Sequence, residues 1–208
     1  MLVLSIYQSF ISGLLATTPL EAIGVIAGIV SVYFSKKEHV WVFPTGLVNT
    51  IIYIYISIKG SLWGEASVNV YYTIMSVYGW YLWTRKTTEH HQLINITYSS
   101  RNEWVQQLIF FSSIYIIIFF LLTYVQQSFA EGAIPWADAL GSASAYTGMW
   151  LMAKKKIESW FWWILTNLVS IPLYFTKGYV FTSVQFLCLL ILAIAGLMEW
   201  RKKIKLIN

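Results

Sequence analysis

The chain has 208 residues, of which 58% are hydrophobic and only 11% charged. A soluble domain carries about 25% charged residues, so this chain is expected to face lipid over most of its surface, as an all-α integral membrane protein. The net charge of +5 comes from Lys and Arg in short clusters between apolar runs, a topology signal that argues against a nucleic-acid-binding groove.

Eight apolar segments follow one another along the chain. Residues 1–18 are apolar with interspersed polar side chains, and Pro19 follows them, which predicts a short helix at the membrane interface or packed on the bundle rather than a full span. Seven core transmembrane helices are expected after it, at about 20–35, 40–58, 64–84, 104–125, 136–152, 157–176 and 179–199. Several are shorter than the ~20 residues of a perpendicular span, so their ends are expected to reach the interface.

The distribution of basic residues predicts the orientation. With seven spans, 12 of the 14 Lys and Arg residues fall on one side of the membrane, and the other side has only Lys59 and Lys177. Basic loops stay in the cytoplasm. The C-terminus is therefore predicted to be cytoplasmic, in a multi-pass protein of the inner (plasma) membrane.

The two halves of the chain resemble each other at an offset of 116 to 118 residues. Glu21 corresponds to Asp138, and Trp83 to Trp200; further pairs are Asn49 with Asn167, Lys59-Gly60 with Lys177-Gly178, and Ser67-Val68-Asn69 with Ser183-Val184-Gln185. The predicted domains are an N-terminal helix at 1–18, a first three-helix repeat at 19–84, a cytoplasmic loop at 85–103, a linker helix with an outer loop at 104–135, a second repeat at 136–200 and a basic cytoplasmic tail at 201–208.

One linker helix between two three-helix repeats makes the repeats parallel, a 3+1+3 plan. Duplicated transporters bind substrate at the repeat interface near mid-membrane. A structural membrane protein could inherit the same duplication, so this alternative stays open.

A polar stripe on the segment at 157–176 marks a candidate binding face. Trp160, Trp163, Asn167, Ser170 and Tyr174 recur at helical spacing among apolar neighbours. Polar groups facing lipid without a partner cost several kcal/mol, on the order of 2–7. A wet cavity lined by this face is the interpretation favoured by the sequence. The alternative for the indoles is anchoring at the membrane interface.

Other candidate substrate-binding residues lie at corresponding positions of the two halves. Asn49 and Asn167 both fall in the second helix of their repeat, and their carboxamides can donate and accept hydrogen bonds without burying a charge. Helix–helix hydrogen bonding is the structural alternative for both. The third helices add Asn69, Tyr72 and Trp80 in the first half and Gln185 in the second.

Specific runs of residues are similar to the Pnu family of vitamin transporters. They are Phe43-Pro44-Thr45-Gly46-Leu47-Val48-Asn49, Tyr78-Gly79-Trp80-Tyr81-Leu82-Trp83 and Glu158-Ser159-Trp160-Phe161-Trp162-Trp163 followed by Asn167. The resemblance covers about residues 20–203. It implies a SWEET-like arrangement of helices and facilitated diffusion of an unphosphorylated vitamin, which a cytoplasmic kinase then traps. It also implies a homotrimer.

The resemblance leads to nicotinamide riboside as the predicted substrate, with thiamine and riboflavin as alternatives within the family. Nicotinamide riboside and thiamine carry a cationic heteroaromatic ring, which an indole face attracts. No cofactor or metal is expected, because no Cys/His cluster has ligand spacing. A membrane-embedded enzyme is the main alternative class, but the predicted spans contain no His and no internal acid pair, so the protein is not expected to be an enzyme.

Overall fold

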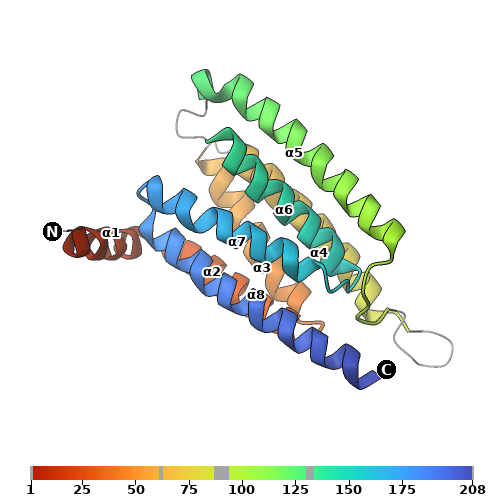
Figure 1. Ribbon diagram of the computed structural model, residues 1–208. Helices are drawn as coiled ribbons and strands as arrows, with labels where there is room; N and C mark the ends of the chain where they lie inside the picture. Colours follow the sequence, from red (N-terminus) through yellow and green to blue (C-terminus); the bar gives the residue numbers. More distant parts are fainter. Residues whose placement is uncertain (1, 61–62, 87–93, 130–133, 208) are drawn as a thin grey trace.

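The computed structural model of the chain describes residues 2–60, 63–86, 94–129 and 134–207. The regular structure in these ranges is helical, apart from isolated β-bridges, such as the one between Thr97 and Lys156. The helices are α1 (Leu2–Ala16), α2 (Pro19–Lys37), α3 (Val42–Lys59), α4 (Trp63–Thr84), α5 (Arg101–Phe129), α6 (Pro135–Ala153), α7 (Ser159–Thr176) and α8 (Val180–Ile207) (Figure 1). The all-helical prediction is confirmed. Parts of two predicted loops, residues 87–93 and 130–133, lie outside the described residues.

The helix boundaries follow from local signals. The Thr18 hydroxyl accepts a hydrogen bond from the Glu21 amide at 3.2 Å, and Pro19 occupies the first turn of α2, where its missing N–H costs nothing. Glu38 ends α2 in the left-handed conformation, with φ 58°. At α6 the Asp138 carboxylate accepts the Ile134 amide at 2.7 Å, so this acid serves a helix N-terminus.

Two helices are longer than the predicted segments. α5 begins at Arg101, and α8 continues to Ile207 through the residues expected to form a basic tail. The continuation of α8 has a physical reason, because Lys, Arg and Leu are good helix formers and Ile204 is buried against the bundle.

Six helices close a ring. α2 packs on α3, α3 on α4, α4 on α6, α6 on α7, α7 on α8, and α8 on α2. The helices that join the two halves of the sequence are therefore α4 with α6 and α8 with α2. Among the described residues the backbone of α5 approaches only α6, and that of α1 only α8 (Figure 1). The ring encloses a central axis that side chains of all six helices can reach.

Four of the described helices are both long and apolar enough to cross a membrane, namely α2, α3, α5 and α8. The other three helices of the predicted spans, α4, α6 and α7, have 22, 19 and 18 residues, which is also a spanning length. They carry more Trp, Tyr, Asn and Ser, or more small residues, and so are less apolar in composition.

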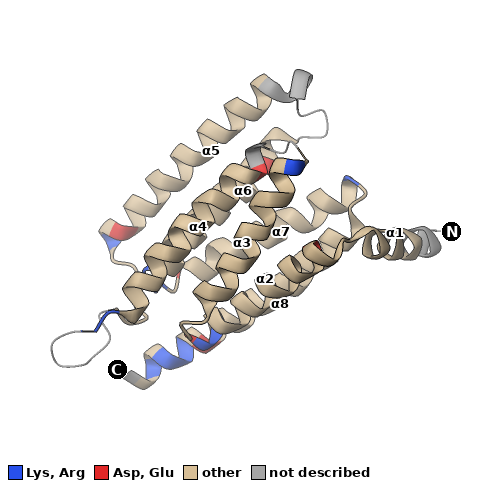
Figure 2. Cartoon of the chain, turned by 180° about the vertical axis from the view of Figure 1, so that it is seen from behind, with Lys and Arg blue, Asp and Glu red and all other residues tan. Residues whose placement is uncertain are grey.

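The apolar core of the ring gathers at one end. Phe43, Trp83, Trp160 and Trp200 are its large members, packed with Ile157 and Leu197. In Figure 2 most of the Lys and Arg residues, drawn in blue, lie at this same end, around the C-terminus. The opposite end of the ring carries Lys177, which pairs with Asp138 at 3.0 Å.

Candidate functional site: an aromatic cluster inside the helix ring

Four aromatic side chains from α4, α6 and α7 meet inside the ring. The rings of Tyr71 and Tyr146 lie 4.4 Å apart, and Tyr72 contacts both Tyr146, at 6.3 Å, and Trp163, at 6.2 Å. The Tyr71 hydroxyl donates a hydrogen bond to the Tyr146 carbonyl at 2.9 Å. These four residues are called the aromatic cluster below.

The aromatic cluster fills a gap between helices. Within the described residues the backbones of α4 and α7 do not come into contact, so Tyr72 and Trp163 reach toward each other across the space between them. Gly148 on α6 makes room for the indole, since a Cβ there would lie 3.3 Å from the Trp163 ring. The helices that supply the aromatic cluster are the three that are less apolar in composition.

Asn167 lies one helical turn beyond Trp163 on α7 and is 4% exposed. No hydrogen bond to its carboxamide is found within the described part of the chain. The hydroxyl of the neighbouring Thr166, in contrast, donates a hydrogen bond to the Trp162 carbonyl at 2.9 Å. A carboxamide without a protein partner can exchange hydrogen bonds with a ligand.

The corresponding residue of the first half behaves differently. The Asn49 carboxamide nitrogen donates to the Gly24 carbonyl on α2 at 2.7 Å, a helix–helix hydrogen bond. Asn69 donates within its own helix, to the Glu65 carbonyl at 2.9 Å. Asn49 thus joins two helices of the first half, whereas the Asn69 bond stays within α4.

The remaining predicted site residues lie away from the aromatic cluster. Trp160 is 1% exposed and packs edge-to-face on Trp200, with ring centroids 5.5 Å apart. Trp80 is 39% exposed, and Gln185 is half-buried on α8. The structure thus brings Tyr72 and Trp163 together, with Asn167 adjacent on α7, and separates Trp160 from Trp163.

The sequence analysis missed two members of the aromatic cluster, Tyr71 and Tyr146. A signal for Tyr146 was present, because it is a large side chain in a run of small residues, Gly141-Ser142-Ala143-Ser144-Ala145 followed by Thr147-Gly148. A single bulky residue in such a run contacts neighbouring helices that the small residues allow to come close.

The site offers uncharged groups to a ligand. Its groups are phenols, an indole and a carboxamide, which can stack on a flat ring and exchange hydrogen bonds with it. Within the described ranges no three His, Cys, Asp or Glu side chains approach closely enough to hold a metal ion.

Comparison with known proteins assigns the chain to a family. The model of the nicotinamide mononucleotide transporter family matches residues 18–202, nearly the whole chain. The chain belongs to this family. The resemblance to the Pnu transporters deduced from the motifs is therefore confirmed, and the protein is a member of a family of membrane transporters.

Two curated members of related function are similar over most of their length. The nicotinamide riboside transporter PnuC of Escherichia coli is 21% identical over 201 residues, covering 87% of this chain and 84% of the relative. The riboflavin/roseoflavin transporter RibM of Streptomyces davaonensis is 24% identical over 183 residues, covering 86% and 83%.

A solved structure shares the fold of this family member. The crystal structure of the vitamin B3 transporter PnuC matches with a TM-score of 0.67 at 18% identity, over 98% of this chain and 90% of the other. The helical arrangement described above is therefore that of a known membrane transporter fold.

Proposed function

We propose that this protein carries nicotinamide riboside into the cell by facilitated diffusion. The observation that supports this best is the buried Asn167 carboxamide, without a protein partner in the described residues, beside the aromatic cluster inside a closed ring of helices. A nicotinamide carries a carboxamide on a cationic ring, so Asn167 can exchange hydrogen bonds with its amide while Trp163 and Tyr72 contact the ring face. Each such cation–π contact contributes about 0.5–2 kcal/mol.

The proposed architecture is the 3+1+3 arrangement with seven spans and parallel repeats. Residues at corresponding positions of the two halves contact each other at the same end of the ring, which supports it: the Ser35 hydroxyl donates to the Met152 sulfur at 2.9 Å, and the rings of Trp83 and Trp200 lie 6.2 Å apart. Inverted repeats would hold such pairs at opposite membrane surfaces.

The proposed topology places the C-terminus in the cytoplasm and the chain in the inner (plasma) membrane. The concentration of Lys and Arg at the end of the bundle that carries the C-terminus supports it (Figure 2). α1 crosses the direction of the bundle helices beside α8 (Figures 1 and 2), which suits an interfacial helix. The domain boundaries given above and a homotrimer are part of the same proposal.

The proposed mechanism is alternating access without ion coupling, with rocking of the two three-helix halves about the aromatic cluster. The cluster contains no carboxylate, imidazole or ammonium group, and its phenols are uncharged at neutral pH, which favours transport without proton coupling. A cytoplasmic kinase would trap the vitamin by phosphorylation. Uptake of nicotinamide riboside into proteoliposomes with no ion gradient is expected; strict dependence on a proton or sodium gradient would contradict the uncoupled mechanism.

Riboflavin is the second candidate, because RibM matches this chain about as well as PnuC of E. coli. Thiamine remains a third. Calorimetric titration of the purified protein with all three vitamins decides among them. The tightest binding is expected for nicotinamide riboside; tighter binding of riboflavin or thiamine would reassign the substrate, and binding of none would refute vitamin transport.

A further inference from the structure

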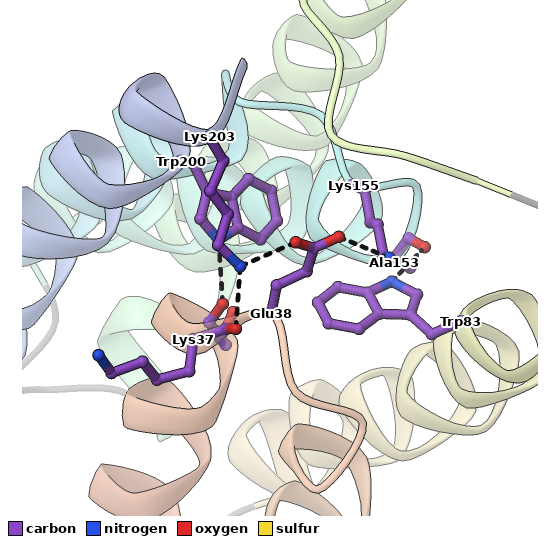
Figure 3. Close-up of polar contacts among 8 residues, drawn as sticks. Lys37, Glu38, Trp83, Ala153, Lys155, Trp200 and Lys203 are labelled. Atoms are coloured by element: carbon purple, nitrogen blue, oxygen red, sulfur yellow. Dashed lines mark hydrogen bonds and ion pairs between the residues drawn. The ribbon is translucent and has the colours of Figure 1, made fainter. Parts of the chain in front are cut away.

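Two residues at corresponding positions of the halves form an ion pair. Glu38 and Lys155 are 117 residues apart, the offset of the two halves, and the Lys155 ammonium lies 2.8 Å from the Glu38 carboxylate. Both follow the first helix of their half, and both have positive φ, 58° and 53°. Lys203 on α8 completes the pair at 2.9 Å from the other Glu38 oxygen (Figure 3).

Next to this ion pair the two halves repeat one aromatic arrangement. Phe43 lies edge-to-face on Trp83 at 5.1 Å and 87°, and Trp160 lies edge-to-face on Trp200 at 5.5 Å and 88°. Phe43 and Trp160 are again 117 residues apart, as are Trp83 and Trp200. The ion pair and these four rings are called the inner plug below.

One tryptophan of each half also donates a hydrogen bond to the other half. The Trp83 indole N–H donates to the Ala153 carbonyl, and the Trp200 indole N–H to the Ser35 carbonyl, both at 3.1 Å. Each acceptor is in the last turns of the first helix of the opposite half. Figure 3 shows the Trp83–Ala153 bond on one side of Glu38 and Trp200 on the other. Contacts that cross between the halves in both directions must break when the halves separate.

The inner plug closes the basic end of the ring. Phe43, Lys155, Trp160 and Trp200 are each at most 2% exposed, so water does not reach this end of the axis. The residues come from α3, α4, α7, α8 and the turns after α2 and α6, so the plug spans the ring. A charged ammonium that is 1% exposed is tolerated because its carboxylate partner is in contact.

The turn that carries Lys155 is also held in place by hydrogen bonds to Thr97 and Ser99. The Thr97 amide donates to the Lys155 carbonyl at 3.2 Å, and the Ile157 amide donates to the Thr97 carbonyl at 3.1 Å. The amide and hydroxyl of Ser99 both donate to the Glu158 carboxylate. These bonds restrict bending of the turn, so the distance between Glu38 and Lys155 changes when the two halves separate.

From this arrangement we infer that the inner plug is the cytoplasmic gate of the transporter, with the Glu38–Lys155 pair as its latch. The inference rests on the proposed transport function. When the halves separate at this end, water reaches the buried Lys155 ammonium, and each half keeps its own pair of aromatic rings. The pair favours closing of the gate, because without Glu38 the Lys155 ammonium would be buried with no carboxylate to balance its charge.

Thiol labelling tests the gate without substrate. Ser76, which is 3% exposed, lies on α4 about 10 Å further into the bundle than Trp83, two helical turns away. The parent protein is Ser76→Cys with Cys188→Ser, in membrane vesicles that present the C-terminal side to a membrane-impermeant thiol reagent. Glu38→Gln is expected to raise the labelling rate about tenfold or more, because closure would bury the Lys155 ammonium without its carboxylate partner.

Two further variants make the outcome decisive. Lys155→Met removes the buried charge and should raise labelling less than Glu38→Gln does. Asp138→Asn breaks an ion pair at the opposite end of the ring, within one half, and should leave labelling unchanged. An unchanged rate in Glu38→Gln, or an equal rise in Asp138→Asn, overturns the gate. Absence of vitamin uptake by the unmodified protein overturns the transport function, whatever the labelling shows.

Discussion

Replacing Asn49 and Asn167 by alanine, one at a time, should have opposite effects on stability and binding. The Asn49 carboxamide holds α2 and α3 together through the Gly24 carbonyl at 2.7 Å. Asn49→Ala removes that bond and should lower the free energy of unfolding by about 0.5–2 kcal/mol. The carbonyl that it leaves keeps its bond within α2, which holds the cost to this range.

Asn167→Ala removes a buried carboxamide for which the described residues provide no partner. Its unfolding free energy should therefore stay within about 0.5 kcal/mol of the parent value, or rise. Its affinity for nicotinamide riboside should fall by about 5- to 150-fold, the equivalent of one to two lost hydrogen bonds to a ligand at about 1–3 kcal/mol.

Both effects can be measured on the same purified samples. Thermal unfolding in detergent, followed by tryptophan fluorescence, gives stability, and calorimetric titration with nicotinamide riboside gives affinity. The two variants change the same side chain at corresponding helical positions, so each is the control for the other. The assignment of Asn167 to substrate would be refuted by normal affinity in Asn167→Ala together with lowered stability.

Three further predictions concern the aromatic cluster and the inner plug. Trp163→Ala should weaken binding of a cationic vitamin by about 2- to 30-fold in the same titration; unchanged binding would assign the indole to packing. Gly196→Ala places a Cβ 2.4 Å from the buried Trp160 ring and should destabilise the fold by about 1–3 kcal/mol in thermal unfolding, whereas Gly141→Ala, with 3.7 Å to its nearest neighbour, should be neutral or stabilising. Burial raises the pKa of the Glu38 carboxyl, but Lys155 and Lys203 outweigh it and hold the pKa below its ordinary value, so the stability from this pair is present above about pH 4.5 and is lost as the pH falls through the lowered pKa. The Tm of the parent protein should fall more steeply below about pH 4.5 than that of Glu38→Gln, and parallel curves would contradict the pair's contribution.

The positions of the helices can be predicted from the sequence, but the contacts between them cannot. The lengths of the apolar segments and the basic clusters between them predict where the described helices lie, because both can be read from the composition of each segment alone. The partners of Trp160 and Trp163 depend instead on neighbouring helices. Trp160 packs against Gly196 of α8 and Trp163 against Gly148 of α6, two positions where the absence of a Cβ leaves room for an indole. Spacing along α7 alone therefore grouped two residues that the fold separates.

The offset between the halves held more information about the site than was drawn from it. Pairs of like residues, such as Asn49 with Asn167, suggest equal roles, yet one is bonded to Gly24 and the other is not. Pairs of oppositely charged residues suggest no shared role in the sequence. Glu38 and Lys155 differ in charge, so their correspondence becomes visible only when the fold places them face to face.

The unlike charges of that pair also determine which protein chains can assemble in this way. On the proposed duplication, two identical copies of the first half would set a carboxylate against its own duplicate, and two copies of the second half would set ammonium against ammonium. Both homotypic pairings would be repelled at a buried position. The salt bridge thus favours pairing of the two non-identical halves, and a separately expressed half should associate with its counterpart rather than with itself.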